Sequence, residues 1–186
     1  MKRQAIAASL LGLALLLASP GAAHVTATPN EGVAGSYMRA SFAVTHGCDG
    51  KPTVAVRIVL PEDVVVARPQ AKPGWRIEIR RAALARPVPA GHGRMATERV
   101  AEIEWSGGRL DDAHYDEFGL SLKLPDVGDR MLWFKVTQVC DGAEVEWSQI
   151  PGPGERWGAL PSPAPYIILR PPPRAKADEG EHSHRH

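Results

Sequence analysis

His24 is the residue of this sequence whose type and position support the most distinctive chemistry. Residues 21–23 are small and would suit signal peptidase, so a cut after Ala23 would make His24 the first residue of the mature chain. A first-residue histidine carries a free amine beside its imidazole, and the two nitrogens can chelate one metal ion. Such donors suit tetragonal Cu(II), which binds tightest among the first-row divalent ions. Because the amine must lose its proton, binding should weaken in acid.

The expected cut follows from the first residues of the sequence. Lys2 and Arg3 precede an apolar run from Ala5 to Ala18, which is shorter than the ~18–20 residues that span a bilayer. We therefore predict that residues 1–23 are a cleaved signal peptide and that the protein is periplasmic or extracellular. The alternatives are an uncleaved anchor, a cut one or two residues away, which would destroy the amine–imidazole pair, or an unliganded, frayed terminus.

A carboxylate is the natural next ligand, and Glu117 is the leading candidate. It lies on the polar face of a predicted strand whose other face carries Phe118 and Leu120. A solvated glutamate is the ordinary alternative for such a position. The competing carboxylates are Glu31, Asp111, Asp112 and Asp116. The sequence also holds five tryptophans, one of which could shield a metal from water and make a cation–π contact.

Two cysteines, Cys48 and Cys140, are each followed by Asp-Gly. In an exported chain such a pair favours a disulfide over a thiolate metal site, and closing this loop is worth about 4 kcal/mol in the loop-entropy model. Loss of Lys2 and Arg3 leaves 20 of the 22 basic side chains against 21 acidic ones. This balance does not favour nucleic acid as a partner, and no further apolar segment is long enough to span a membrane.

The elements that must position these residues are predicted to be strands. Apolar and polar residues alternate with period two in short runs that Pro and Gly separate, which is typical of antiparallel sheets with one buried face. We expect a β-sandwich domain over residues 24–170. Ala83 to Glu98 lacks a period and is predicted to be a long loop, and residues 171–186 are predicted to be a disordered tail whose histidines bind metal weakly. The expected strand segments are 36–45, 53–60, 64–67, 75–80, 101–105, 117–124, 131–139, 144–147 and 166–169.

No nucleophile and base stand at spacings that indicate a hydrolase. Several short motifs, however, occur in the order found in one family. The sequence resembles the YcnI-like family of exported copper-binding domains. The matching segments are His24-Val25-Thr26, Gly35-Ser36-Tyr37, His46-Gly47-Cys48-Asp49-Gly50, Lys72-Pro73-Gly74-Trp75, Ile103-Glu104-Trp105-Ser106-Gly107-Gly108, Glu117-Phe118, Gln138-Val139-Cys140-Asp141-Gly142, Val145-Glu146-Trp147 and Ala164-Pro165.

This resemblance implies an all-β, immunoglobulin-like antiparallel β-sandwich that binds one Cu(II) per chain. It implies a single-histidine brace at His24, a glutamate ligand at Glu117, and a tryptophan beside the metal at Trp147, with Trp75 as the alternative. It implies a non-enzymatic role in copper storage, delivery or homeostasis. The expected partners are the copper ion and other periplasmic copper carriers or a copper transporter.

Two other functions remain open from the sequence. A copper mono-oxygenase would need a second histidine, and His46, His92 and His114 qualify by type only. A metal-free module could instead bind a partner through an exposed sheet edge. One histidine in the brace offers few nitrogen donors and favours holding copper over oxidising with it.

Overall fold

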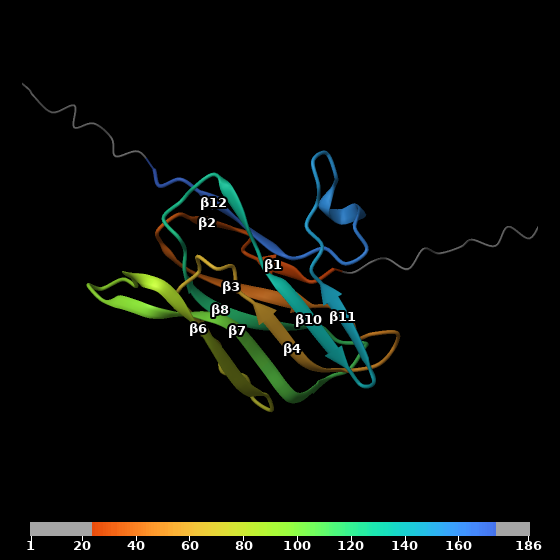
Figure 1. Cartoon of the computed structure of the whole chain (residues 1–186). Helices are drawn as coiled ribbons and strands as arrows, with labels where there is room; N and C mark the ends of the chain where they lie inside the picture. The colour runs from red at the N-terminus through yellow and green to blue at the C-terminus, as the bar shows by residue number, and fades with distance from the viewer. Residues whose placement is uncertain (1–23, 174–186) are drawn as a thin grey trace, which may run out of the picture.

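Two β-sheets pack face to face in the computed structural model, which describes residues 24–173, and a small third sheet closes one end (Figure 1). The predicted signal peptide and residues 174–186 of the predicted tail lie outside the described residues. The strands are β1 (Thr26–Thr28), β2 (Glu31–Val33), β3 (Tyr37–Val44), β4 (Thr53–Val59), β5 (Ala67–Pro69), β6 (Arg76–Pro89), β7 (Met95–Leu110), β8 (Asp116–Lys123), β9 (Arg130–Trp133), β10 (Lys135–Cys140), β11 (Ala143–Trp147) and β12 (Tyr166–Arg170).

The strand orders define which elements lie at the sheet edges. The first sheet runs β1-β3-β8-β5, and the second runs β11-β10-β4-β7-β6. All pairings in these two sheets are antiparallel. The third sheet, β2-β12-β9, contains the one parallel pair of strands among residues 24–173, β2 with β12. The all-β prediction is therefore confirmed. Between residues 24 and 173 the only helical element is a 3₁₀ turn, η1 (Trp157–Ala159), and no helix is long and apolar enough to cross a membrane.

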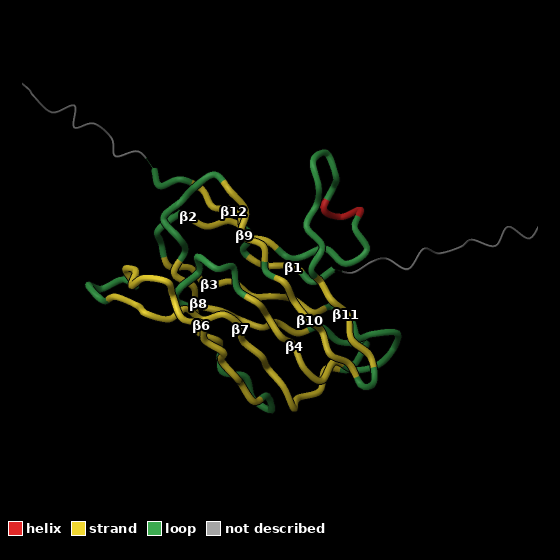
Figure 2. The backbone as a smooth tube through the Cα atoms, viewed as in Figure 1, coloured by secondary structure: helices red, strands yellow, loops and turns green. Residues whose placement is uncertain are grey.

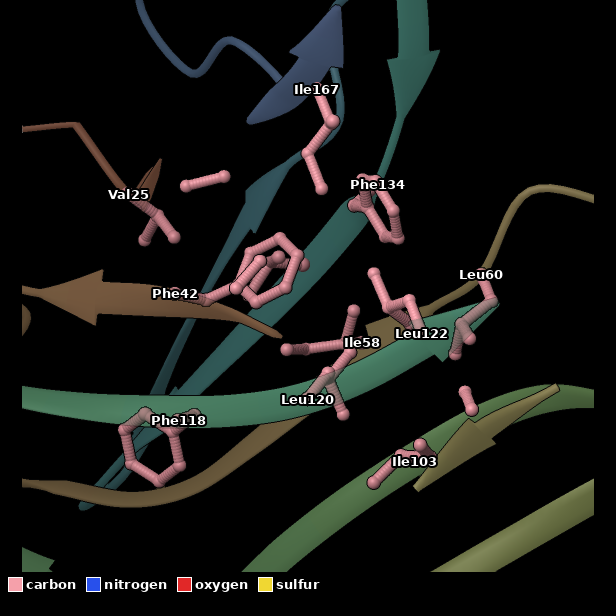
Figure 3. Close-up of a cluster of buried hydrophobic side chains, with 14 of the residues drawn as sticks. Val25, Phe42, Ile58, Leu60, Ile103, Phe118, Leu120, Leu122, Phe134 and Ile167 are labelled. Atoms are coloured by element: carbon pink, nitrogen blue, oxygen red, sulfur yellow. The ribbon is translucent and has the colours of Figure 1, made fainter. Parts of the chain in front are cut away.

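The core lies between the two large sheets and follows from the alternation in the sequence. On β8, Phe118, Leu120 and Leu122 are buried while Glu117 and Ser121 face outward. Phe42 of β3 packs against Phe134 with ring centroids 5.1 Å apart (Figure 3). Each such side chain contributes roughly 1.5–3 kcal/mol by leaving water. This continuous apolar layer is what holds the two sheets, and hence their edges, in one arrangement.

Three sequence predictions about elements were wrong. Of the expected strand 64–67, only Ala67 belongs to a strand, β5, and residues 64–66 lie outside any strand. Ala83 to Glu98 is not a long loop, because β6 and β7 pair across it as an extended hairpin that turns between Pro89 and Met95. Its side chains are mostly exposed and its register shifts between Ala83 and Val88, so no period-two pattern marks it. The run 131–139 is also not one strand. It breaks at Phe134, so β9 joins the third sheet and β10 joins the second.

The Cys48–Cys140 disulfide joins the turn after β3 to the end of β10 and so links the two large sheets. The Cα atoms are 5.9 Å apart, within the usual range for a disulfide. Asp49 and Gly50 both have positive φ, as a tight two-residue turn requires, which explains the Asp-Gly after Cys48. The prediction of a disulfide is confirmed.

Candidate metal centre

β1 holds His24 at the edge of the first sheet. Its Thr26 pairs with Ala43 of β3, and the side chains of Val25 and Ala27 are buried in the core. These two inward anchors on either side of Thr26 fix the backbone that follows His24. The side chain of His24 is itself half-buried. The described chain therefore begins with a docked residue rather than a frayed one.

The imidazole of His24 lies among one carbonyl and two indoles. Its Nε2 is 3.0 Å from the carbonyl oxygen of Leu160, which lies 136 positions further along the chain. The ring centroid is 5.0 Å from that of Trp157 and 6.0 Å from that of Trp147. Because a carbonyl oxygen can only accept, Nε2 carries the proton in this contact. In the neutral ring, Nδ1 then keeps its lone pair, which is the nitrogen a metal can use.

Trp147 is held from behind by a buried hydrogen-bond network. It ends β11, the edge strand of the second sheet, and is 5% exposed. Its indole N–H donates to Oε1 of Gln138 at 3.1 Å, and Nε2 of Gln138 donates to the carbonyl of His46 at 2.7 Å and to Oγ1 of Thr53 at 2.8 Å. Gln138 is 1% exposed. Sequence patterns did not single out this glutamine, because one buried amide in a strand leaves no periodic signal.

The loop between β11 and β12 brings Trp157 onto His24. Its two ends are tied together, because the backbone N–H groups of Ser148 and Gln149 both donate to the Ser162 carbonyl at 3.0 Å. The indole N–H of Trp157 donates to the Ala164 carbonyl at 2.7 Å. Figure 2 shows this loop, with η1 in red, standing beside the start of the described chain. Sequence patterns did not mark Trp157, and the one available signal was a tryptophan inside an otherwise Pro- and Gly-rich segment.

Glu117 lies on the same sheet as β1, two strands away. It pairs with Ala43, which pairs with Thr26, so Glu117 and Thr26 stand about 10 Å apart across β3. Ala43, which lies between them, has a small side chain and leaves room above β3 for the longer side chain of Glu117. The ring partners of His24 within residues 24–173 are Leu160, Trp147 and Trp157, and the carboxylate of Glu117 is not among them. In the structure, Glu117 therefore lies two strands from β1 and makes no contact with the His24 ring.

The competing carboxylates are each engaged elsewhere. Asp116 pairs with Lys72 at 2.6 Å, and Asp111 pairs with Arg109 at 2.9 Å. Oδ1 of Asp112 accepts the backbone N–H of Gly47 at 2.9 Å. The guanidinium of Arg170 hydrogen-bonds Glu31 and lowers its pKa below the usual value. By contrast, the Glu117 carboxylate has no ion pair among residues 24–173.

The two candidate tryptophans, Trp75 and Trp147, lie in different places, and the three candidate second histidines differ in their distance from His24. Trp75 packs edge-on against Phe118 with centroids 5.1 Å apart, whereas Trp147 lies beside His24. His92 stacks on Tyr37 at the hairpin tip, and His114 is exposed in the turn before β8. His46 shares a neighbour with His24, since its ring centroid is 6.3 Å from that of Trp147.

The donors at this corner set a limit on how a metal could be held. Within residues 24–173, no three side chains of His, Cys, Asp or Glu gather in a way that could hold a metal ion. A metal at His24 therefore needs main-chain donors as well. The amine of His24 is such a donor only in a chain that begins there, and with Nδ1 it would form a chelate. The residues present fit a brace and do not fit a site made of side chains alone.

Comparison with known proteins agrees with this fold. A family model described as a domain of unknown function, DUF1775, matches residues 24–169. The protein is 23% identical over 142 residues to the "Copper-binding protein CutI" of Bacillus subtilis (strain 168), which covers 75% of this chain and 62% of that relative. The chain thus spans less than two thirds of the relative's length.

A solved structure from Nocardia farcinica, reported to reveal an immunoglobulin-like fold, superposes with a TM-score of 0.59 at 24% identity. The match covers 79% of this chain and 98% of that one, and it shows that the sandwich is immunoglobulin-like. Because the family model matches most of the sequence, the chain belongs to the DUF1775 family, and with its copper-binding relative it fits the YcnI-like domains that its motifs resemble.

Proposed function

We propose that this chain is a copper-binding protein that holds one Cu(II) ion at a brace formed by the amine and Nδ1 of His24. The observation that carries the proposal is the contact of His24 Nε2 with the Leu160 carbonyl, which leaves Nδ1 available. The name of the Bacillus subtilis relative supports copper as the metal. The proposal requires that the mature chain begins at His24, after export and removal of residues 1–23.

The remaining residues have distinct roles in this proposal. Glu117 supplies a carboxylate oxygen from β8, which requires its side chain to lean across Ala43. Trp147 and Trp157 flank the imidazole and exclude water from it. Cu(II) favours such a tetragonal set of nitrogen and oxygen donors. Gln138 acts behind Trp147 as a positioning residue.

The site suits holding and passing on a metal better than oxidising a substrate. A bound ion would lie at the edge of the sandwich, beside a loop, where another copper carrier or a transporter could approach. An oxidative enzyme would need a second imidazole ligand, and His46 is the candidate to test because its ring, like that of His24, lies beside Trp147. Oxygen consumption by the copper-loaded protein with a reductant, lost in His24→Ala, would favour that second function.

The test is a Cu(II) titration followed by EPR on protein that begins at His24, as confirmed by mass spectrometry. His24→Ala, and a chain with one glycine ahead of His24, should both change the spectrum and weaken binding by more than the 10–100-fold that outer-shell changes cost. The added glycine is the sharper variant because it keeps the imidazole and removes only the adjacent amine. Glu117→Gln should weaken binding less than either.

Two controls separate this site from other histidines. His92→Ala changes an exposed imidazole at the hairpin tip and should leave the spectrum intact. A variant with His182, His184 and His186 changed to alanine should still bind one Cu(II) at His24. If the glycine-extended protein keeps the same spectrum and affinity, the brace is wrong.

A further inference from the structure

Two arginines stand on one rung of the first sheet, on its outer face. Arg39 of β3 and Arg68 of β5 both pair with Ser121 of β8, one from each side. All three side chains are exposed. Two strand spacings separate the arginine Cα atoms by about 10 Å, so both guanidinium groups can reach the space above Ser121.

Two hollows with residues in common open at this rung. One hollow of about 380 Å³ is lined by Arg39, Arg68, Gly119 and Ser121 among others. A second hollow, of about 350 Å³, shares Arg68 and Ser121 with the first and adds Arg94 from the hairpin. We call the two hollows together the arginine groove. Its lining includes the small residues Ser41, Gly119 and Ser121, and the side chain of Gln70 lies against Gly119.

The arginine groove carries positive charge that the described residues do not neutralise. No ion pair joins Arg39, Arg68 or Arg94 to a carboxylate within residues 24–173. On the second sheet, by contrast, two arginines are paired with glutamates. Arg57 lies 2.9 Å from Glu104, and Arg80 lies 2.6 Å from Glu102. Like charges on one rung repel, so the groove is suited to a ligand that brings carboxylates.

The described chain ends next to this groove. A third hollow, of about 550 Å³, is lined by Pro172 together with Val66, Gly91 and Lys123. Val66 also lines the second hollow, so Pro172, near the end of the described residues, lies close to the arginine groove. Lys123 and Ser121 are two residues apart on β8, so their Cα atoms are separated by about 7 Å.

We propose that the acidic segment 178–181, Asp-Glu-Gly-Glu, binds in the arginine groove of its own chain. Three carboxylates occur there within four residues, which matches the three unpaired arginines. The five steps from Pro173 to Asp178 reach about 17 Å when extended, more than the distance along the sheet requires. A tether of this length gives a millimolar effective concentration, so weak individual ion pairs suffice.

Docking of this segment has a consequence for the histidines that follow it. His182, His184 and His186 would be held within about 17 Å of Glu181 and hence of the first sheet. Composition alone predicts disorder for this tail, and the groove supplies the partner that would order part of it.

The experiment compares amide spectra of the full mature chain, residues 24–186, at low salt. The test variant is Asp178→Asn with Glu179→Gln and Glu181→Gln, which removes charge and keeps shape. It should shift the amides of Arg39, Arg68, Gly119 and Ser121. About 0.5 M salt, where the Debye length is near 4 Å, should shift the wild-type amides in the same direction.

The reciprocal variant is Arg39→Gln with Arg68→Gln, which should shift the amides of residues 178–181. The matched control is Arg76→Gln, an exposed arginine of β6 outside the groove, which should leave those amides unchanged. Recovery of the wild-type pattern by a charge swap, with Arg39→Glu and Arg68→Glu against lysines at 178, 179 and 181, would support direct pairing.

Three outcomes would overturn the proposal. The first is an absence of shifts in the groove when the tail carboxylates are neutralised. The second is a shift that grows with protein concentration, which would assign the groove to the tail of a second copy. The third is binding of inorganic phosphate to wild type and tail variant with equal affinity, which would show that the tail does not occupy the groove.

Discussion

Replacing Gln138 by leucine should destabilise the protein more than any exposed substitution, because this one buried amide joins three parts of the structure. It accepts from the Trp147 indole and donates to His46 and Thr53. Leucine has a similar volume and can make none of these contacts. The variant therefore tests the network and leaves little empty space behind.

The size of the effect follows from the groups left without partners. The Trp147 N–H and the Thr53 hydroxyl are both buried, and an unsatisfied buried donor or acceptor costs about 1–3 kcal/mol. Thr53 keeps a weak contact with Sγ of Cys140 at 3.8 Å, and leucine gains from burial of its apolar surface. The expected net loss in the free energy of unfolding is about 3 kcal/mol.

Urea denaturation monitored by circular dichroism would measure this loss, and Gln70→Leu at an exposed position is the control, with a change within about 0.5 kcal/mol. A double-mutant cycle with Trp147→Phe isolates the indole contact and should show a coupling of about 1 kcal/mol. A loss below about 0.5 kcal/mol for Gln138→Leu, or strict additivity with Trp147→Phe, would refute this reasoning.

Other predictions concern the disulfide, the core and a surface ion pair. Reduction of Cys48–Cys140, which are 92 positions apart, should remove about 4–5 kcal/mol and lower Tm by about 10–15 °C in calorimetry; an unchanged Tm would contradict this. Phe118→Ala should cost about 3–5 kcal/mol in urea denaturation because the ring is fully buried between two indoles, and a loss below about 1.5 kcal/mol would argue against tight packing there. In an NMR titration the pKa of Glu31 should lie below the ordinary value for a glutamate, because the side-chain hydrogen bond from Arg170 lowers it. Since the folded pKa is the lower one, the stabilisation is present above the unfolded pKa and fades as the pH falls through the folded one; Arg170→Gln should return the midpoint to the ordinary value.

The sequence predicted the sandwich well wherever one face of a strand is buried. β3 and β8 were predicted because Phe42 and Phe118 point into the core, whereas Glu117 of β8 is exposed. The hairpin from Ala83 to Glu98 escaped this reasoning because both of its faces are largely exposed. Its pairing comes from backbone hydrogen bonds, which carry no side-chain pattern.

The candidate site was predictable only in part. His24 was marked by its position after small residues, and motif resemblance pointed to Trp147, which lies beside it. Trp157 and the Leu160 carbonyl could not be predicted, because a contact across 136 positions depends on tertiary packing. In addition, every residue has a backbone carbonyl, so no residue type marks the one that contacts His24. The placement of Glu117 as a ligand stays a prediction.

The contact between His24 and Leu160 also bears on the order of events during folding. The corner around His24 is assembled from the first described residues and from a loop near the end of the domain, so it forms only when β11, β12 and the segment between them are in place. Contacts this distant in sequence form slowly, because the entropic cost of closing a long loop comes before the contacts stabilise the chain. In the proposed brace, an incompletely folded chain would still offer copper the amine and the imidazole of His24, whereas the two flanking indoles and the contact with the Leu160 carbonyl would be added only by folding.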